Sequence, residues 1–468
     1  MTASRAVSLL LLAVACSSSD GGDAPADAST GGGPGDGSLG DGSWPDAGFD
    51  AEASVPVDAD AADAAGEEDA APPAPELATI HSQHRFVQSA MFGGWGPHLG
   101  HLVRASASSG AGTSLWFVDD SCAQTGGAGV VCDVLDNHTL GYFEKTASGW
   151  QARGSVTLPA GIQQNTATLA GATGGVLHTY GVDVKNHVLR ECSFATATGP
   201  TGCSALPFTL LPSSNYLGAA IAPNGSRLVW WTTVVDGGGG SFHYVVDYGG
   251  GWNGPRSGGV GGYNDASYAN IAFGGDAPSR FTLHGQLVSG LAPNWGFVGA
   301  VGTGDLTTTD AVVWSTPFGA AADPVVSTND IWTDPASDDT HLVARTQAGA
   351  AAYYHRPKGG GWSVKPFLLP ATYRARFVLS LNRLVLVYGP NAGGLAWRIA
   401  APSARPAGSP VDWAKLPEHV LALPGDFGAV QAIYPESPAY QKAPASGIHV
   451  ALVGATKQNV VLHAAIEP

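Results

Sequence analysis

Four histidines form the first group of side chains that could do chemistry. They fall within 21 residues, as His81-Ser-Gln-His84 and His98-Leu-Gly-His101. Imidazole is a common metal ligand, but residues three apart on a β-strand point to opposite faces. Neither pair is therefore a ready chelate. We expect loop and strand-edge histidines, with no bound metal or other cofactor.

Carboxylates form the second group. After residue 76 the chain has five glutamates, namely Glu144, Glu191, Glu418, Glu436 and Glu467. A retaining glycosidase needs two carboxyl groups at one site, and nothing in the spacing brings two together. No Gly-x-Ser-x-Gly nucleophile motif occurs either. The sequence thus names no catalytic residue, and it favours a binding protein over an enzyme.

Three acidic stretches have a simpler explanation as turns. Asp119-Asp120 and Asp338-Asp339 are predicted to be solvated turns. Asp236, followed by four glycines, is predicted to be a hairpin tip, because no helix follows it to bind a phosphate.

Composition limits the classes of function. Charged residues make up 13% of the 468 residues, and the formal net charge is −16. Binding to nucleic acid needs clustered Lys and Arg, so it is excluded. Residues 17–76 carry 15 of the 38 acidic residues and no Lys or Arg, so the acidity belongs to this segment and the rest of the chain is nearly neutral.

The N-terminus has the pattern of an export signal. Arg5 precedes an apolar run at 6–15, which is too short to span a bilayer. The sequence Leu12-Ala13-Val14-Ala15-Cys16 resembles the lipobox of bacterial lipoproteins, which implies a signal peptide at 1–15 and a lipid on Cys16. The alternative is ordinary secretion, because Ala13-Val14-Ala15 also fits an A-x-A cleavage site. We expect a lipid anchor in the cell envelope, and Ser17 favours the outer membrane of a Gram-negative bacterium by resemblance to lipoprotein sorting.

The segment after the cysteine is predicted to be a disordered spacer. Residues 16–76 are mostly Ser, Gly, Asp, Ala and Pro, which cannot bury enough apolar surface to offset the entropy of ordering. The other four cysteines lie as two close pairs. In an oxidising compartment we expect disulfides Cys122–Cys132 and Cys192–Cys203, which leave Cys16 for the lipid.

Residues 77–468 have the pattern of a β-repeat. Segments rich in Val, Leu, Tyr, Trp and Thr alternate with turn residues. Three stretches, 142–150, 244–252 and 353–362, each start with Tyr and end with glycine followed by Trp. The Trp spacings, 102 and 110 residues, are about two periods of 51 and 55, and Trp413 follows after one more period of 51. Four short strands per period of this length are typical of a propeller blade.

Counting the periods predicts an all-β chain with a seven-bladed β-propeller, six blades being the alternative. The blades fall roughly at 97–160, 161–212, 213–262, 263–319, 320–370, 371–425 and 426–468. The last shows three strands, so we expect a spare strand at 80–90 to complete it and close the ring. Each blade-ending Trp is predicted to pack between neighbouring sheets.

These blade endings resemble those of the sialidase-like and BNR-like propellers of secreted bacterial proteins, and more loosely those of the fungal-type fucose lectins. The likeness concerns the fold, since the Asp-box motif Ser-x-Asp-x-Gly-x-x-Trp occurs in no blade. The sialidase resemblance implies an arginine triad, a Tyr–Glu nucleophile pair and an acidic Asp.

Propellers usually bind ligands at one mouth of the central channel, where loops lead into the innermost strands. Amide, tyrosine and arginine side chains there suit a polar ligand such as a sugar. Packing and turn formation are the alternative roles. The candidates are Asn165, Asn215, Tyr216, Asn264, Tyr268, Tyr373, Arg374, Arg376 and Asp426.

Together these observations predict a surface-tethered lipoprotein. Its propeller is expected to bind a glycan or an envelope protein without catalysis. The alternative is a glycoside hydrolase or lyase acting on extracellular carbohydrate.

Overall fold

A computed structural model describes the propeller region strand by strand. It describes residues 75–82, 100–122, 138–158, 168–183, 185–211, 214–222, 225–233, 241–259, 265–273, 279–289, 296–308, 312–316, 318, 325–334, 336–348, 350–363, 367–369, 375–380, 383–390, 393–436, 447–454 and 460–466. The predicted signal peptide and nearly all of the predicted spacer lie outside these residues. No helix among the described residues has the length and apolar character that crossing a bilayer requires.

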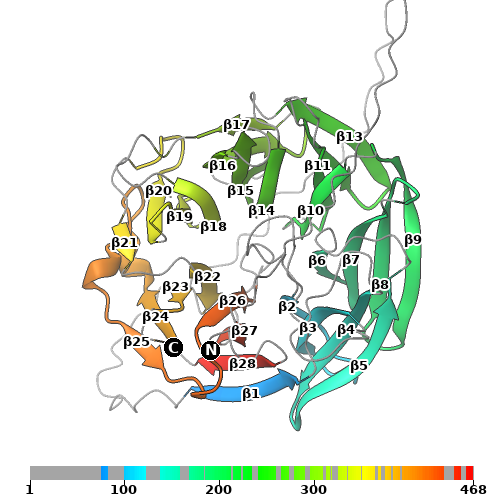
Figure 1. The fold of residues 1–468 in the computed structure, drawn as a ribbon, viewed down its shortest axis with the longest axis horizontal. Coiled ribbons are helices and arrows are strands. Elements are labelled where there is room, and N and C mark those ends of the chain that lie inside the picture. The colour runs from blue at the N-terminus through cyan, green and yellow to red at the C-terminus, as the bar shows by residue number, and fades with distance from the viewer. Residues whose placement is uncertain are drawn as a thin grey trace, which may run out of the picture. The chain divides into compact units, whose positions relative to one another are not determined.

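The strands form seven four-stranded antiparallel sheets, each a blade (Figure 1). Blade 1 comprises β2 (Gly100–Ser106), β3 (Thr113–Cys122), β4 (His138–Thr146) and β5 (Gly149–Thr157). Blade 2 comprises β6 (Thr168–Thr173), β7 (Val176–Asp183), β8 (Val188–Ala195) and β9 (Gly199–Thr209). Blade 3 comprises β10 (Ser214–Ile221), β11 (Arg227–Thr233), β12 (Ser241–Asp247) and β13 (Trp252–Gly259).

The remaining blades repeat this order. Blade 4 comprises β14 (Asp265–Phe273), β15 (Arg280–Ser289), β16 (Gly296–Asp305) and β17 (Val313–Ser315). Blade 5 comprises β18 (Val325–Thr333), β19 (Thr340–Thr346), β20 (Ala351–Arg356) and β21 (Phe367–Leu369). Blade 6 comprises β22 (Ala375–Ser380), β23 (Arg383–Tyr388), β24 (Leu395–Ala400) and β25 (His419–Leu421), with 3₁₀ helices η2 (Pro402–Ala404) and η3 (Trp413–Lys415) before β25. Blade 7 comprises β26 (Val430–Pro435), β27 (Ile448–Gly454), β28 (Val461–Ile466) and β1 (Glu76–His81).

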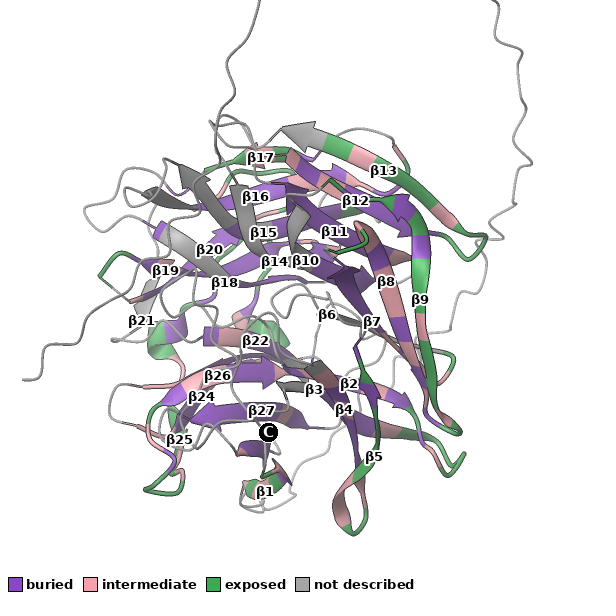
Figure 2. Cartoon of the chain, turned by 45° about the vertical axis from the view of Figure 1, so that its right-hand side comes forward, coloured by how far each residue is buried: buried purple, intermediate pink, exposed green. Residues whose placement is uncertain are grey.

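The sheets form a closed ring. The first strand of each blade contacts the first strand of the next, from β2 through β6, β10, β14, β18 and β22 to β26 and back to β2. Seven blades and an all-β fold are as the sequence predicts. Buried apolar residues fill the spaces between neighbouring blades, and burial decreases toward the outer strands such as β9 and β13 (Figure 2).

The N-terminal strand completes the last blade. β1 pairs antiparallel with β28, so the first and last of the described strands lie side by side (Figure 1). The sequence predicts this strand at 80–90. The described strand shares only Ile80 and His81 with that segment, and residues 83–90 lie outside the description. The strand lies earlier in the sequence than predicted because its apolar residues are the ones that pack: Leu77 packs against the core between blades 6 and 7, and Ile80 is buried at the interface with blade 1.

The blade-ending tryptophans pack between blades, as predicted. Trp150 lies against the cluster between blades 7 and 1, Trp252 against that between blades 2 and 3, and Trp362 against that between blades 4 and 5. Trp413, which is fully buried in η3, belongs to the core between blades 5 and 6. Glycines with positive φ precede two of them, Gly149 at 105° and Gly251 at 117°, so the turn there needs a residue without a Cβ.

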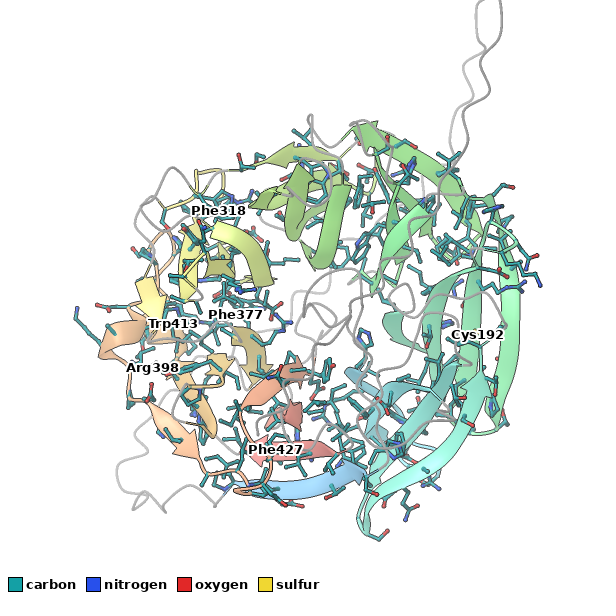
Figure 3. All side chains as sticks on the ribbon, viewed as in Figure 1. Cys192, Phe318, Phe377, Arg398, Trp413 and Phe427 are labelled. Carbon is teal, nitrogen blue, oxygen red and sulfur yellow. A yellow bond between two sulfur atoms is a disulfide. The ribbon has the colours of Figure 1, made fainter. Side chains whose placement is uncertain are left out.

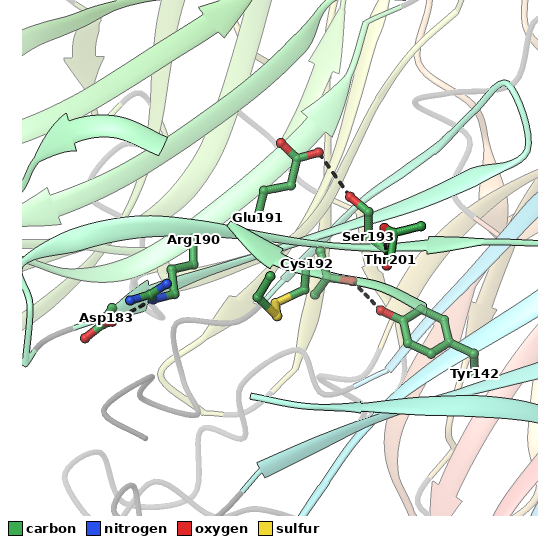
Figure 4. The surroundings of a disulfide bond; sticks show 9 residues. Tyr142, Asp183, Arg190, Glu191, Cys192, Ser193 and Thr201 are labelled. Carbon is green, nitrogen blue, oxygen red and sulfur yellow. Dashed lines mark hydrogen bonds and ion pairs between the residues drawn. A yellow bond between two sulfur atoms is a disulfide. The ribbon is translucent and has the colours of Figure 1, made fainter. Parts of the chain in front are cut away.

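One predicted disulfide is present in the structure. Cys192 of β8 and Cys203 of β9 are directly opposite partners in the ladder and are bonded to each other (Figure 4). Cys122 ends β3, whereas Cys132 lies outside the described residues, so the Cys122–Cys132 bond stays a prediction.

We expect the Cys192–Cys203 bond to hold the outer strand β9 on its blade. Replacing both cysteines with serine should lower the free energy of unfolding by about 2–3 kcal/mol, the range for a loop of this size. Chemical denaturation of the oxidised protein and of the double variant measures the difference. Equal denaturation midpoints would show that β9 is held by its ladder alone.

Candidate functional site

The innermost strands form the wall of the central channel, and their first residues lie at one mouth. Blades 1 to 6 are meanders that start at their innermost strand, and blade 7 starts in the same way at β26 before β1 completes it, so all seven inner strands run in the same direction along the channel. Loops that enter these strands therefore share one face of the ring. The turns between the first and second strands lie on the opposite face.

The structure places five of the nine predicted ligand-binding residues in this framework. Asn215 and Tyr216 lie in β10, Tyr268 lies in β14, and Arg376 lies in β22. Asp426 is exposed in the connection between β25 and β26. Asn165, Asn264, Tyr373 and Arg374 lie outside the described residues.

β-Bulges recur in the inner strands. The ladder register shifts in β6, β10, β14, β18 and β26. In β10 the shift falls between Asn215 and Gly218, and in β14 it falls between Ser267 and Asn270. These intervals contain Tyr216 and Tyr268. Bulges are common beside binding and active sites, because they locally redirect a strand.

Arg376 is the predicted arginine whose side chain the structure describes. It is half-buried at the second position of β22. Alternate residues of a strand share a face, so Arg376 lies on the side of Val378, which packs in the core between blades 6 and 7. Arg376 therefore lies near the end of β22 at which the chain enters from the predicted mouth, on the face of blade 6 that packs against blade 7.

Sequence reasoning missed an ionic cluster between blades 2 and 3. Arg227, the first residue of β11, donates to Asp247 of its own blade over 2.5 Å and to Glu191 of blade 2 over 2.5 Å. His178 lies 2.6 Å from the same Glu191 oxygen. Arg227 also stacks over the ring of Trp252. The cluster lies where β11 begins, on the turn face of the ring and away from the predicted mouth.

The charges of this cluster do not suit acid catalysis. Burial opposes ionisation of Glu191, but hydrogen bonding from His178 and the charge of Arg227 outweigh it and lower the pKa. In Asp247 the effect of burial is likewise outweighed, by hydrogen bonds from Arg227 and from the backbone N–H groups of Gly249 and Gly251. A general acid needs a raised carboxyl pKa. Glu191 and Asp247 are instead held ionised around one arginine, so the cluster joins blades 2 and 3 through ion pairs.

A Tyr–Glu pair does occur in blade 6. The Tyr388 hydroxyl donates to Glu418, and Arg398 donates to both. Tyr388 is fully buried, and burial raises its pKa to about 12, so it is neither accessible nor ionised as a nucleophile must be. Figure 3 places Arg398 and Trp413 on the outer side of the blade, whereas Phe377 lies nearer the centre of the ring. The Tyr388–Glu418 pair therefore stabilises the structure of blade 6.

The histidines of the first group do not assemble into a described metal site. His81 Nε2 lies 3.9 Å from the buried carboxylate of Asp119. Burial lowers the pKa of His101 to about 4. His84 and His98 lie outside the described residues, and within the described part of the chain no three potential metal ligands gather.

The predictions that Asp119 and Asp339 lie in solvated turns are wrong, because both residues are buried. Asp119 is fully buried within β3, and Asp339 is 3% exposed. Asp339 accepts hydrogen bonds from the backbone N–H groups of Lys358 and Gly408 and lies 3.1 Å from His355 Nε2. It thereby ties blade 5 to the long connection before β25, a contact between distant segments that local sequence does not encode. Asp338 does lie in a turn, with a φ of 59°, and Asp236 lies outside the described residues.

Comparison with known proteins supports the fold. No protein-family profile and no curated protein matches the chain. Among solved structures it is similar to the polysaccharide lyase Uly1, with a TM-score of 0.50 and 11% identity over 85% of this chain and 99% of that one. The lectin SapL1, in complex with α-methyl fucoside, has a lower TM-score of 0.38 and 14% identity over 73% of this chain and 98% of that one. The α-L-arabinofuranosidase Arb93A from Fusarium graminearum has a TM-score of 0.41 and 10% identity over 74% of this chain and 98% of that one.

At these identities the likeness to solved structures concerns the fold alone. The circular order of the sheets and the fold shared with Uly1 both indicate a β-propeller. Residues 76–466 of this chain form a seven-bladed β-propeller closed by its own N-terminal strand.

Proposed function

We propose that this protein is a surface-tethered lipoprotein whose propeller recognises a glycan or a partner protein outside the cell without catalysis. The observation that carries the proposal is the pair of bulges in neighbouring inner strands, β10 and β14, around the predicted residues Tyr216 and Tyr268. Tyrosine offers a face for the apolar side of a sugar, and the amide and arginine side chains among the other predicted residues offer hydrogen bonds.

Catalysis is the weaker alternative. Among the described carboxyl groups with shifted pKa values, all are lowered, namely Glu144, Asp183, Glu191, Asp247, Asp305, Asp412 and Glu418. A hydrolase of extracellular carbohydrate would need a carboxyl group that keeps its proton near neutral pH. Polysaccharide lyases and glycosidases occur among proteins of this fold, so turnover is tested alongside binding.

A glycan array tests the proposal. The full chain carrying Cys16→Ser, which removes the predicted lipid site, is expected to bind a restricted set of glycans and to leave each one intact by mass spectrometry. Binding followed by cleavage would replace the proposal with the enzyme alternative. An array without specific signal would leave a protein partner as the ligand.

The tether gives a separate prediction. Cys16→Ser should move the protein from the membrane fraction to the soluble extracytoplasmic fraction, because lipid supplies the anchor. Immunoblotting of separated fractions measures this. Retention of the variant on the membrane would contradict lipidation at Cys16.

A further inference from the structure

Two histidines lie together at the seam where the ring closes. His449 of β27 and His463 of β28 are diagonal neighbours in the ladder, since Ala451 pairs with His463 and His449 pairs with Ala465. Their rings stack at 9°, with centroids 5.3 Å apart, and His449 Nδ1 lies 3.1 Å from His463 Nε2. One nitrogen must therefore donate to the other.

The closing strand β1 and blade 1 cover His463. Ala78 of the closing strand β1 is its direct partner in the ladder. Trp150 of blade 1 meets its ring edge-on, with centroids 5.1 Å apart. The His463 side chain is 1% exposed, and its Nδ1 atom makes no hydrogen bond. The imidazole pair thus lies within the contact between blades 7 and 1.

The hydrogen bonds favour an uncharged pair. If His463 Nε2–H donates to His449, His463 Nδ1 keeps only a lone pair, which is tolerable without a partner. A proton added to His463 would put an N–H with no acceptor, and a charge, into a buried site. A proton added to His449 Nδ1 would set two N–H groups against each other over 3.1 Å.

The charged groups around the pair are of both signs. Arg104 of β2 and Lys145 of β4 face it, while Glu76 of β1 acts in the opposite sense. Glu436 is 2.6 Å from Arg104, and Glu76 is 3.2 Å from Lys145. Burial, with Arg104 and Lys145 in support, lowers the pKa of His449 to about 4. Burial, with His449 and Lys145 in support, lowers the pKa of His463 to about 3.

We propose that His449 and His463 make the ring closure acid-sensitive, so that transient local opening of β1 from β28 becomes more frequent as the medium acidifies. The sign follows from proton linkage. An exposed histidine has a pKa of 6.5, so the opened seam binds more protons than the closed one, and closure weakens as pH falls from 6.5 toward 4. At the far end of β1, His81 Nε2 also faces a titratable group, the buried carboxylate of Asp119, at 3.9 Å.

Hydrogen exchange of the full chain at pH 7.0 and 4.5, corrected for intrinsic exchange rates, tests the proposed acid sensitivity of the ring closure. We expect residues 76–81 to lose protection roughly tenfold or more at the lower pH, since linkage through one histidine with this shift already reaches that size. Strand β25, the outer strand of blade 6, is the internal reference and should change much less.

Matched variants distinguish acid-sensitive closure through His449 and His463 from general acid denaturation. His449→Gln with His463→Gln should abolish most of the pH dependence at 76–81, whereas His419→Gln, an exposed histidine of β25, should leave it unchanged. The proposal is overturned if the double variant keeps the pH dependence of the parent. Should that variant not fold, equal acid-induced loss of protection in β1 and β25 of the parent would overturn it.

Discussion

Deleting residues 76–81 is expected to abolish the cooperative unfolding transition of the propeller. The deletion removes one strand of four from blade 7 and uncovers the edge of β28, including the buried residues Val461 and Leu462. It also removes Ile80 from the core between blades 7 and 1, and burial of that side chain alone contributes about 2 kcal/mol. A domain stable by 5–15 kcal/mol does not tolerate an open ring with an exposed edge. Circular dichroism during heating and size-exclusion chromatography measure the loss.

The control for this deletion removes residues 17–74 and keeps β1. Because none of the strands in the described sheets comes from residues 17–74, this shorter chain should melt at the same temperature as the parent. A deletion of 76–81 that also melts like the parent would refute closure by β1.

Arg227→Ala is expected to cost roughly 3 kcal/mol of stability, the range for removing one partner of a buried ion pair. The substitution leaves Glu191 and Asp247 ionised, with side chains that are 11% and 8% exposed, and without their shared cation. It also removes the stacking over Trp252 and the hydrogen bond to Tyr180. Urea denaturation with two-state analysis gives the difference in free energy of unfolding.

The repeat supplies a matched control at the equivalent position of blade 4. Arg280 begins β15 as Arg227 begins β11, and each is the ladder partner of an aspartate that ends the next strand. The Arg280 side chain is 45% exposed, and its Nε lies 3.6 Å from Asp305, so Arg280→Ala should change stability by less than about 1 kcal/mol. Equal losses in the two variants would show that Arg227 does not clasp blades 2 and 3 together.

The sequence predicts the fold better than it predicts the site, because the fold repeats. Period, glycine turns and blade-ending tryptophans are local signals that recur, and Trp150, Trp252, Trp362 and Trp413 all pack between blades. Cysteine spacing likewise identified Cys192–Cys203, because the two residues sit opposite each other across one hairpin.

Contacts between distant segments are what local sequence does not encode. Asp339 was predicted to be solvated, yet Gly408, 69 residues later, donates to its carboxylate. Glu191 was recognised as one of few glutamates, but its partner Arg227 lies 36 residues away on the next blade. A signal was present: Arg227 and Asp247 occupy the ends of paired strands, as Arg280 and Asp305 do one blade later.

The most direct test of the proposed binding mouth compares two arginine variants on the glycan array. Arg376→Ala alters the inner strand β22 near the predicted mouth, whereas Arg280→Ala alters an exposed arginine on the opposite face of the ring. We expect Arg376→Ala to weaken binding about tenfold or more, the effect of losing a charge-assisted hydrogen bond, and Arg280→Ala to leave it unchanged. Full binding by Arg376→Ala, or equal loss in both variants, would contradict recognition at the mouth of the channel.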